Sequence, residues 1–272
     1  MRLIDTHCHL AHGRLRQNLD DVLQRARAAG VVACICAAGN LHEARTALGL
    51  ARTHEGVYFT AGVHPHDAKD AGEGYLEALA QLCAEGRNVA VGEIGLDYHY
   101  DFSPRDVQQR VFAEQLACAR EIGKVIVIHT REAFEDTLAI LAESGVDCGR
   151  VVFHSFTGGV DDGRRALETG AAISFSGIAT FKRADELRKL AAVVPDERIL
   201  IETDSPYLSP EPVRKMRTNE PANVAHVAAC LAAVRGTTPD ALAELTTQNA
   251  ARLFDLDICC LLYTSDAADE LD

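Results

Sequence analysis

The sequence predicts a single-domain α/β protein built as a (β/α)8 barrel of the TIM type. Short apolar runs rich in β-branched residues alternate with longer stretches of helical period along the whole chain. Most of these runs are apolar at consecutive positions, as strands of a parallel sheet covered by helices must be. A length of 272 residues with 47% hydrophobic content also suits one barrel.

Each expected strand is a run of valine, isoleucine, leucine, alanine or phenylalanine that ends in polar residues. In chain order, the expected strands are 3–7, 31–38, 57–64, 89–95, 125–130, 151–156, 171–177 and 199–204. An open, doubly wound sheet is the competing topology. It usually carries a glycine-rich phosphate-binding turn after its first strand, and THCHLAHG is not such a turn.

Between and after these strands, apolar residues recur at spacings of three and four, which indicates amphipathic helices. The expected helices are 19–30, 41–54, 74–86, 104–123, 133–145, 161–170, 184–194, 221–236 and 238–254. Several of them end at a glycine, a common helix stop. The last two follow the eighth strand and are additional to the repeating pattern.

Composition and charge exclude several classes of protein. A formal charge of −13 argues against a protein that coats nucleic acid with a broad basic surface, although an enzyme can still hold a phosphate locally through metals. No apolar run is long enough to span a bilayer and no secretory signal opens the chain. Nine cysteines without a C-x-x-C pair indicate reduced thiols. We therefore expect a cytoplasmic protein with no membrane contact, and we infer no obligate protein partner.

Imidazoles and carboxylates gather at the ends of the expected strands. These residues are His7, His9, Glu93, His129, His154 and Asp204. All strand ends of a barrel meet on one rim, where active sites form. For any one of these residues alone, a hydrogen-bonded role at the rim is the simpler interpretation. Together, without positive partners, they would be left unsatisfied unless a cation holds them, so the set predicts a metal centre.

Several segments resemble the motifs of the TatD-type metal-dependent hydrolases, members of the amidohydrolase superfamily. They are IDTHCHL, GVHPH, GEIGLDY, HTRE, FHSFTG, ETDSPYL and RTNEP, in the family's order from Met1 to about Leu256. The resemblance implies a TIM-type barrel, a pair of divalent metals and phosphodiesterase activity on DNA, often as a 3′-end exonuclease. Some relatives are linked to hydrolysis of the D-aminoacyl-tRNA ester.

Carried over to this sequence, the resemblance implies that His7, His9 and Asp204 hold one metal. It implies His129 and His154 on the second metal, with Glu93 bridging both. Mixed imidazole and carboxylate ligands suit Mg, Mn, Zn or Co. Asp204 and Glu93 are then the expected catalytic residues, with Asp204 the better candidate to take a proton from the attacking water. Glu202 shares the face of Asp204 and is expected to support the site.

Substrate contacts are expected from three further residues, each with a structural alternative. His64 is a candidate contact for the scissile phosphate, or part of a turn set by Pro65. Tyr98 can stack on a base or pack its own loop. Arg131 can clamp a phosphate or pair with a carboxylate of the rim.

The leading expectation is a phosphodiesterase or deoxyribonuclease that acts on DNA ends or short nucleic acid with two divalent ions. An ester or amide hydrolase, such as a D-aminoacyl-tRNA deacylase, is the alternative, because the same ligands can serve attack on a carbonyl. A metal-binding protein without turnover is a third possibility, disfavoured by the presence of Asp204 as a base.

Three smaller expectations concern local structure. Asn219 and Glu220 should cap a helix that starts near Pro221. Cys8 should point away from the two histidines beside it, since alternation along a strand puts it on the opposite face. Residues 1–256 should form the barrel domain and residues 257–272 a non-functional or non-native tail, with packing of CLLY on an apolar patch as the alternative. Deleting everything after Leu256 should leave melting temperature and activity unchanged.

Overall fold

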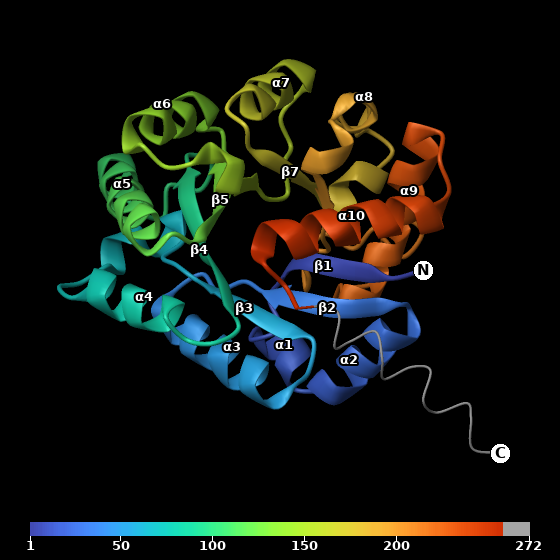
Figure 1. The fold of residues 1–272 in the computed structure, drawn as a ribbon, viewed down its shortest axis with the longest axis horizontal. Coiled ribbons are helices and arrows are strands. Elements are labelled where there is room, and N and C mark those ends of the chain that lie inside the picture. Colours follow the sequence, from blue (N-terminus) through green and yellow to red (C-terminus); the bar gives the residue numbers. More distant parts are fainter. Residues whose placement is uncertain (258–272) are drawn as a thin grey trace.

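A computed structural model describes residues 1–257 and shows a barrel of eight parallel strands (Figure 1). The strands are β1 (Leu3–Cys8), β2 (Val31–Cys36), β3 (Val57–Ala61), β4 (Asn88–Asp97), β5 (Val125–Arg131), β6 (Val151–Phe153), β7 (Ala172–Phe175) and β8 (Ile199–Ile201). They pair in chain order, and a parallel bridge between Cys8 and Ser205 joins the first strand to the segment after the last. The predicted fold is confirmed. The predicted tail, apart from Asp257, lies outside the described residues.

Helices surround the strands in Figure 1. They are α1 (Gly13–Arg16), α2 (Leu19–Ala28), α3 (Leu41–Thr53), α4 (Tyr75–Cys83), α5 (Arg105–Ile122), α6 (Phe134–Ser144), α7 (Val160–Glu168), α8 (Asp185–Val193), α9 (Val224–Arg235) and α10 (Pro239–Phe254). Short 3₁₀ segments are η1 (Pro65–Asp70), η2 (Cys148–Arg150), η3 (Gly177–Thr180), η4 (Asp196–Arg198) and η5 (Pro221–Asn223). Every predicted helix is present, and α1 and the 3₁₀ segments are additional. None of the helices within residues 1–257 is long and apolar enough to cross a membrane.

Strand alternation separates two apolar layers and positions the site. Along β5, Ile126 and Ile128 belong to the large cluster between strands and helices, whereas Val125 and Val127 belong to a smaller cluster inside the barrel. His129 follows Val127 by two residues, so the alternation directs it to the inner face as well. Cys8 belongs to the outer cluster and its Sγ donates to the Ile35 carbonyl oxygen at 3.5 Å. Its predicted orientation away from the histidines is confirmed.

Helix α10 closes the end of the barrel opposite the strand carboxyl ends. Phe254, in its last turn, and Leu256 pack in the inner cluster with strand residues. Thr247 Oγ1 donates to the Arg2 carbonyl oxygen at 3.0 Å, and Asn249 Nδ2 donates to the Ile199 carbonyl oxygen at 3.0 Å. The carboxyl ends of the strands are thereby the end of the barrel left for a site.

Gly95 lets β4 approach β5 closely. Its φ is +137°, and a Cβ placed there would lie 2.0 Å from the His129 carbonyl oxygen. We expect Gly95→Ala to destabilise the fold by about 3 kcal/mol, because the strain and the overlap both act against the native backbone. Urea unfolding measures the change. Gly49→Ala in α3, where a Cβ meets nothing within 4 Å, is the matched control and should not lower stability. Equal stability of the two variants would contradict this explanation.

Candidate metal centre

The six residues predicted as metal ligands come together at the carboxyl ends of the strands. His7 lies in β1, Glu93 in β4 and His129 in β5. His9, His154 and Asp204 follow β1, β6 and β8 directly or within three residues. All of these except His7 line one cavity of about 750 Å³, and His7 lies beneath it with 1% of its surface exposed. The closure of the barrel thus brings distant parts of the chain to one point. Register shifts in β1 between Asp5 and Cys8 and in β4 between Val91 and Ile94 interrupt the simple alternation beside His7 and Glu93.

Glu93 is the centre of the cluster and its two oxygens face different histidines. Glu93 Oε2 lies 3.3 Å from His7 Nε2 and 3.9 Å from His9 Nε2. Around Oε1, the distances are 2.7 Å to His154 Nε2, 3.1 Å to His129 Nδ1 and 3.4 Å to His64 Nε2. One buried carboxylate therefore faces five imidazoles, two near Oε2 and three near Oε1.

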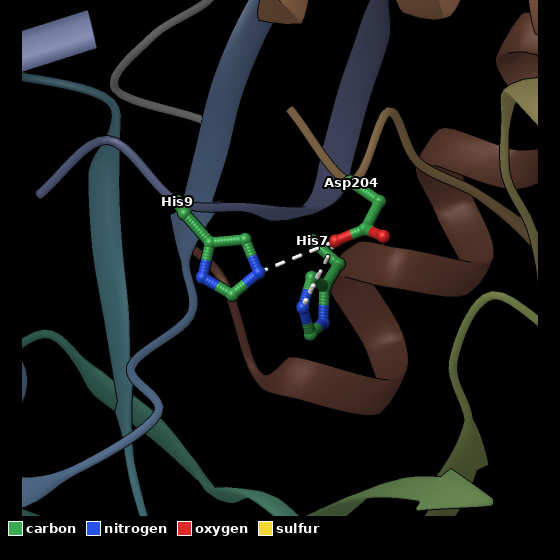
Figure 2. Close-up of side chains that lie close together, drawn as sticks. All are labelled: His7, His9 and Asp204. Carbon is green, nitrogen blue, oxygen red and sulfur yellow. Dashed lines mark ion pairs between the residues drawn. The ribbon is translucent and has the colours of Figure 1, made fainter. Parts of the chain in front are cut away.

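Asp204 completes the group on the Oε2 side (Figure 2). Its Oδ1 lies 3.2 Å from His9 Nε2 and 3.8 Å from His7 Nε2. The Asp204 backbone N–H donates to the His7 carbonyl oxygen at 2.9 Å, and its φ is +53°. Non-glycine residues in this left-handed region are costly and concentrate at functional sites. The turn after β8 is thus tied to β1 in a way that aims the carboxylate at both imidazoles.

The chemistry of these residues fits divalent metal ions. His7 Nε2 and Glu202 Oε2 are buried and make no hydrogen bond within residues 1–257. In the same part of the chain, no lysine or arginine pairs with Glu93 or Asp204. Buried polar atoms without partners are costly, and a cation would satisfy them. Three groups have ligand atoms close enough to share an ion: His7, His9 and Asp204; His7, His154 and Glu202; and His64, Glu93 and His129.

The buried imidazoles and carboxylates of the cluster shift one another's pKa values. Burial opposes the charge on Glu93, but the imidazoles of His154, His64 and His7 outweigh it and hold its pKa well below the usual value. Burial lowers the pKa of His64 to about 4 and, with the neighbouring His154, lowers the pKa of His7. Burial also opposes the charge on His9, His129 and His154, but the neighbouring carboxylates, chiefly Asp204, Asp97 and Glu93 respectively, outweigh it and raise the pKa of these three imidazoles. Since only a neutral imidazole ligates a metal, an ion bound here must displace protons from these rings.

The family follows from a match over nearly the whole described chain. Residues 4–255 match the family model described as TatD related DNase. The chain belongs to the TatD-related DNase family. It is a metal-dependent hydrolase of that family, and its predicted membership is confirmed.

Named relatives of this TatD-family chain agree in length as well as in sequence. The chain is 42% identical over 261 residues to YcfH of Escherichia coli K12, named an uncharacterized metal-dependent hydrolase, covering 94% of this chain and 97% of the relative. It is 36% identical to the 3′-5′ ssDNA/RNA exonuclease TatD of Klebsiella pneumoniae, covering 94% and 99%. Among solved structures, the TatD homologue YjjV of E. coli K12 superposes with a TM-score of 0.89 at 30% identity, covering 94% and 98%.

In this TatD-family site, Glu202 and Asp97 each contact a histidine at the ring nitrogen that does not face Glu93. Glu202 Oε1 lies 3.3 Å from His154 Nδ1 and accepts a hydrogen bond from the Ser155 N–H at 2.7 Å. Asp97 Oδ2 lies 3.0 Å from His129 Nε2 and 2.9 Å from His66 Nε2. Glu202 was expected to support the site. Asp97 was not given this role from the sequence, although it ends the strand that carries Glu93.

We expect Asp97→Asn to lower metal affinity by roughly 10- to 100-fold, the usual effect of removing a carboxylate that orients a ligand histidine. His66 and His129 both contact Asp97 Oδ2, and Oδ1 accepts from the His99 and Tyr100 N–H groups. The asparagine amide must turn its NH₂ group toward one of these two sets of donors, so the ring of His129 is less well fixed. Isothermal titration calorimetry with Mn²⁺ measures the affinity of the chain for the metal. Asp101→Asn, at an exposed carboxylate paired with Arg105, is the control. Unchanged affinity in Asp97→Asn would contradict the orienting role.

The three predicted substrate contacts lie in different environments. His64 is 3.4 Å from Glu93 Oε1 and belongs to one of the groups that could hold a metal, which favours a ligand role over the predicted phosphate contact. Arg131 lines the cavity. The Tyr98 hydroxyl donates to Asp136 at 2.7 Å and its ring lies under the Arg105 guanidinium at 4.4 Å, so Tyr98 packs its loop, the alternative stated above.

The predicted helix caps at Asn219 and Glu220 are wrong. Neither side chain accepts a capping hydrogen bond from the first turn of η5 or α9. Asn219 is fully buried, and its Nδ2 donates to the Thr203 carbonyl oxygen at 3.0 Å, which braces the end of β8. Glu220 pairs with Arg25 at 2.7 Å. A tertiary hydrogen bond to the barrel thus took the place of the local cap that the sequence suggested.

Proposed function

We propose that this chain is a divalent-metal-dependent phosphodiesterase that shortens single-stranded DNA or RNA from an end. The observation that carries the proposal is Glu93, whose two oxygens face two separate groups of imidazoles. The 36% identity to a protein named 3′-5′ ssDNA/RNA exonuclease supports the substrate class. The unpaired cysteines among the described residues support a reducing compartment, and we propose the cytoplasm.

The proposed ligands are His7, His9 and Asp204 for one ion and His129, His154 and His64 for a second, with Glu93 shared. Divalent ions held there supply Lewis-acid polarisation of a phosphate and lower the pKa of a bound water. Asp204 is 15% exposed at the cavity wall, and its pKa is lowered because the His9 hydrogen bond and charge outweigh the opposing effect of burial. Its carboxylate is therefore ionised and able to accept a proton from the attacking water.

Arg131 is the candidate to hold the phosphate from the protein side. It lines the cavity and makes no ion pair within the described residues, so its guanidinium charge is free to meet an anion. Guanidinium groups bind phosphate oxygens in pairs. In a chain of net charge −13, such a local contact replaces the broad basic surface that nucleic-acid-coating proteins use.

Digestion of an end-labelled single-stranded oligonucleotide tests the proposal. The purified chain with Mg²⁺ or Mn²⁺ should shorten the oligonucleotide stepwise, and excess chelator should stop the reaction. Labels at the 5′ and the 3′ end in separate reactions report the polarity. A parallel reaction offers a D-aminoacyl-tRNA. No metal-dependent shortening, together with turnover of the aminoacyl ester, would contradict the phosphodiesterase and favour the ester hydrolase.

A further inference from the structure

The exposed aromatic rings of the part of the chain that the structure describes gather at the mouth of the metal cavity. Among residues 1–257, the aromatic side chains with large exposed fractions are Tyr100 at 47%, Phe102 at 54% and Tyr207 at 47%. Tyr100 and Tyr207 line the cavity that holds Glu93, and Phe102 stacks on Tyr100. Half-exposed aromatic rings are costly to keep in water, and their confinement to one place indicates a binding surface.

Tyr100 and Phe102 form the first of two platforms. Their rings are nearly parallel, at 9°, with centroids 5.2 Å apart. The Arg131 guanidinium lies over the Tyr100 ring at 4.8 Å, and the edge of His66 meets both rings. Asp97 Oδ1 accepts from the Tyr100 N–H at 3.1 Å, so the carboxylate that orients His129 also fixes this loop. The platform is therefore held in a defined position relative to the metal ligands.

Tyr207 forms the second platform. Its ring lies edge-to-face with His9 at 6.0 Å and with His12 at 5.8 Å, and its N–H donates to the Asp204 carbonyl oxygen at 3.0 Å. Tyr207 follows β8, beside β1, whereas Tyr100 follows β4, beside β5. In a closed barrel of eight strands in chain order, these positions are half a turn apart. The two platforms thus stand on opposite sides of Glu93.

We propose that the Tyr100–Phe102 pair and Tyr207 bind the two nucleobases that flank the scissile phosphate. The inference rests on the proposed nuclease function and names the groups that would recognise its substrate. Every base has a flat π face that stacks on an aromatic ring, so this binding tolerates any sequence. Bases paired and stacked in a duplex cannot reach rings on opposite sides of a cavity. Selection of unpaired strands follows from the same geometry.

The test uses the whole chain and end-labelled oligothymidylate. Tyr100→Ala and Tyr207→Ala should each lower kcat/KM by about tenfold, the usual scale of one base–aromatic stack, whereas Tyr100→Phe and Tyr207→Phe should keep it. Binding of a fluorescent oligothymidylate in excess chelator, measured by anisotropy, should weaken in the two alanine variants as well. Ile122→Ala, at an exposed apolar side chain at the end of α5, is the control and should change neither quantity.

Oligonucleotides with one abasic nucleotide separate stacking from other effects. An abasic position on one side of the cleaved bond should abolish the difference between wild type and Tyr100→Ala, and one on the other side should do so for Tyr207→Ala. Alanine variants that slow the normal and the abasic substrates equally, or that slow neither, would contradict base stacking on Tyr100 and Tyr207. The nuclease proposal would not be affected by that result. A wild-type chain without chelator-sensitive cleavage of any strand would overturn the nuclease proposal and this inference with it.

Discussion

Glu93→Gln is expected to reduce hydrolysis by about 10³-fold or more, since loss of several kcal/mol of metal-derived stabilisation of the transition state corresponds to that factor. Glutamine keeps the size of the side chain but removes its negative charge and one of its two acceptor oxygens. Glu93 Oε1 and Oε2 face different groups of histidines, so one group loses its oxygen donor and both groups lose the negative charge of the carboxylate. Initial rates on a labelled oligonucleotide measure the loss.

The matched control for Glu93→Gln is Glu135→Gln, the same chemical change at an exposed carboxylate that pairs with Arg165. It should retain wild-type rates. Circular dichroism and melting curves of both variants show whether each is folded. A folded Glu93→Gln variant with more than a tenth of wild-type activity would contradict the central position given to this carboxylate.

Divalent metal is expected to raise the melting temperature of the chelator-treated chain by about 5 °C or more. A ligand present at 100 times its dissociation constant stabilises the native state by about 2.7 kcal/mol, and each kcal/mol moves the midpoint of a domain of this size by roughly 2–4 °C. The physical reason is local. His7 Nε2 and Glu202 Oε2 are buried without hydrogen-bond partners in the described chain, and ions would satisfy the cluster that contains them.

Differential scanning fluorimetry in chelator and with added Mn²⁺, Zn²⁺, Co²⁺ or Mg²⁺ measures this shift and ranks the metals. Glu93→Gln should show a much smaller shift than wild type, and Glu135→Gln an equal one. The same melting temperature for wild type in chelator and in every metal would be evidence against a built metal site.

The positions of the strands were predictable, although several expected strands run past the observed ends, as 199–204 does against Ile199–Ile201. Two simple regularities explain why the ligands could still be found. Parallel strands in a barrel present their carboxyl ends at one rim, and alternation within a strand carries a ligand such as His129 onto the face of Val127. The histidines and carboxylates at those ends are therefore brought close together. Their final directions also depend on the register shifts in β1 and β4 and on the left-handed φ of Asp204, which no sequence pattern indicated. Eight apolar runs of suitable length were enough to locate them.

Contacts set by the loops were not predictable in the same way. His64 lies beside Glu93 because of the conformation of the segment after β3, and nothing in the sequence pattern predicts that conformation. We assign the proposed platform to Tyr100 and not to Tyr98, because β4 runs on to Asp97 and the following turn partly buries Tyr98 against Asp136 and exposes Tyr100. Asn219 binds the barrel across the fold, a partner that no local pattern indicates.

Metal content of the purified chain is the most direct test of a metal centre built around Glu93. Wild-type protein saturated with Mn²⁺ or Zn²⁺ and freed of excess metal by gel filtration is analysed by inductively coupled plasma mass spectrometry. We expect two ions per chain in wild type and in Glu135→Gln, and a loss of metal in Glu93→Gln. Wild-type protein that hydrolyses its substrate without bound metal would contradict a metal centre built around Glu93. A Glu93→Gln variant that keeps two ions per chain would contradict it as well.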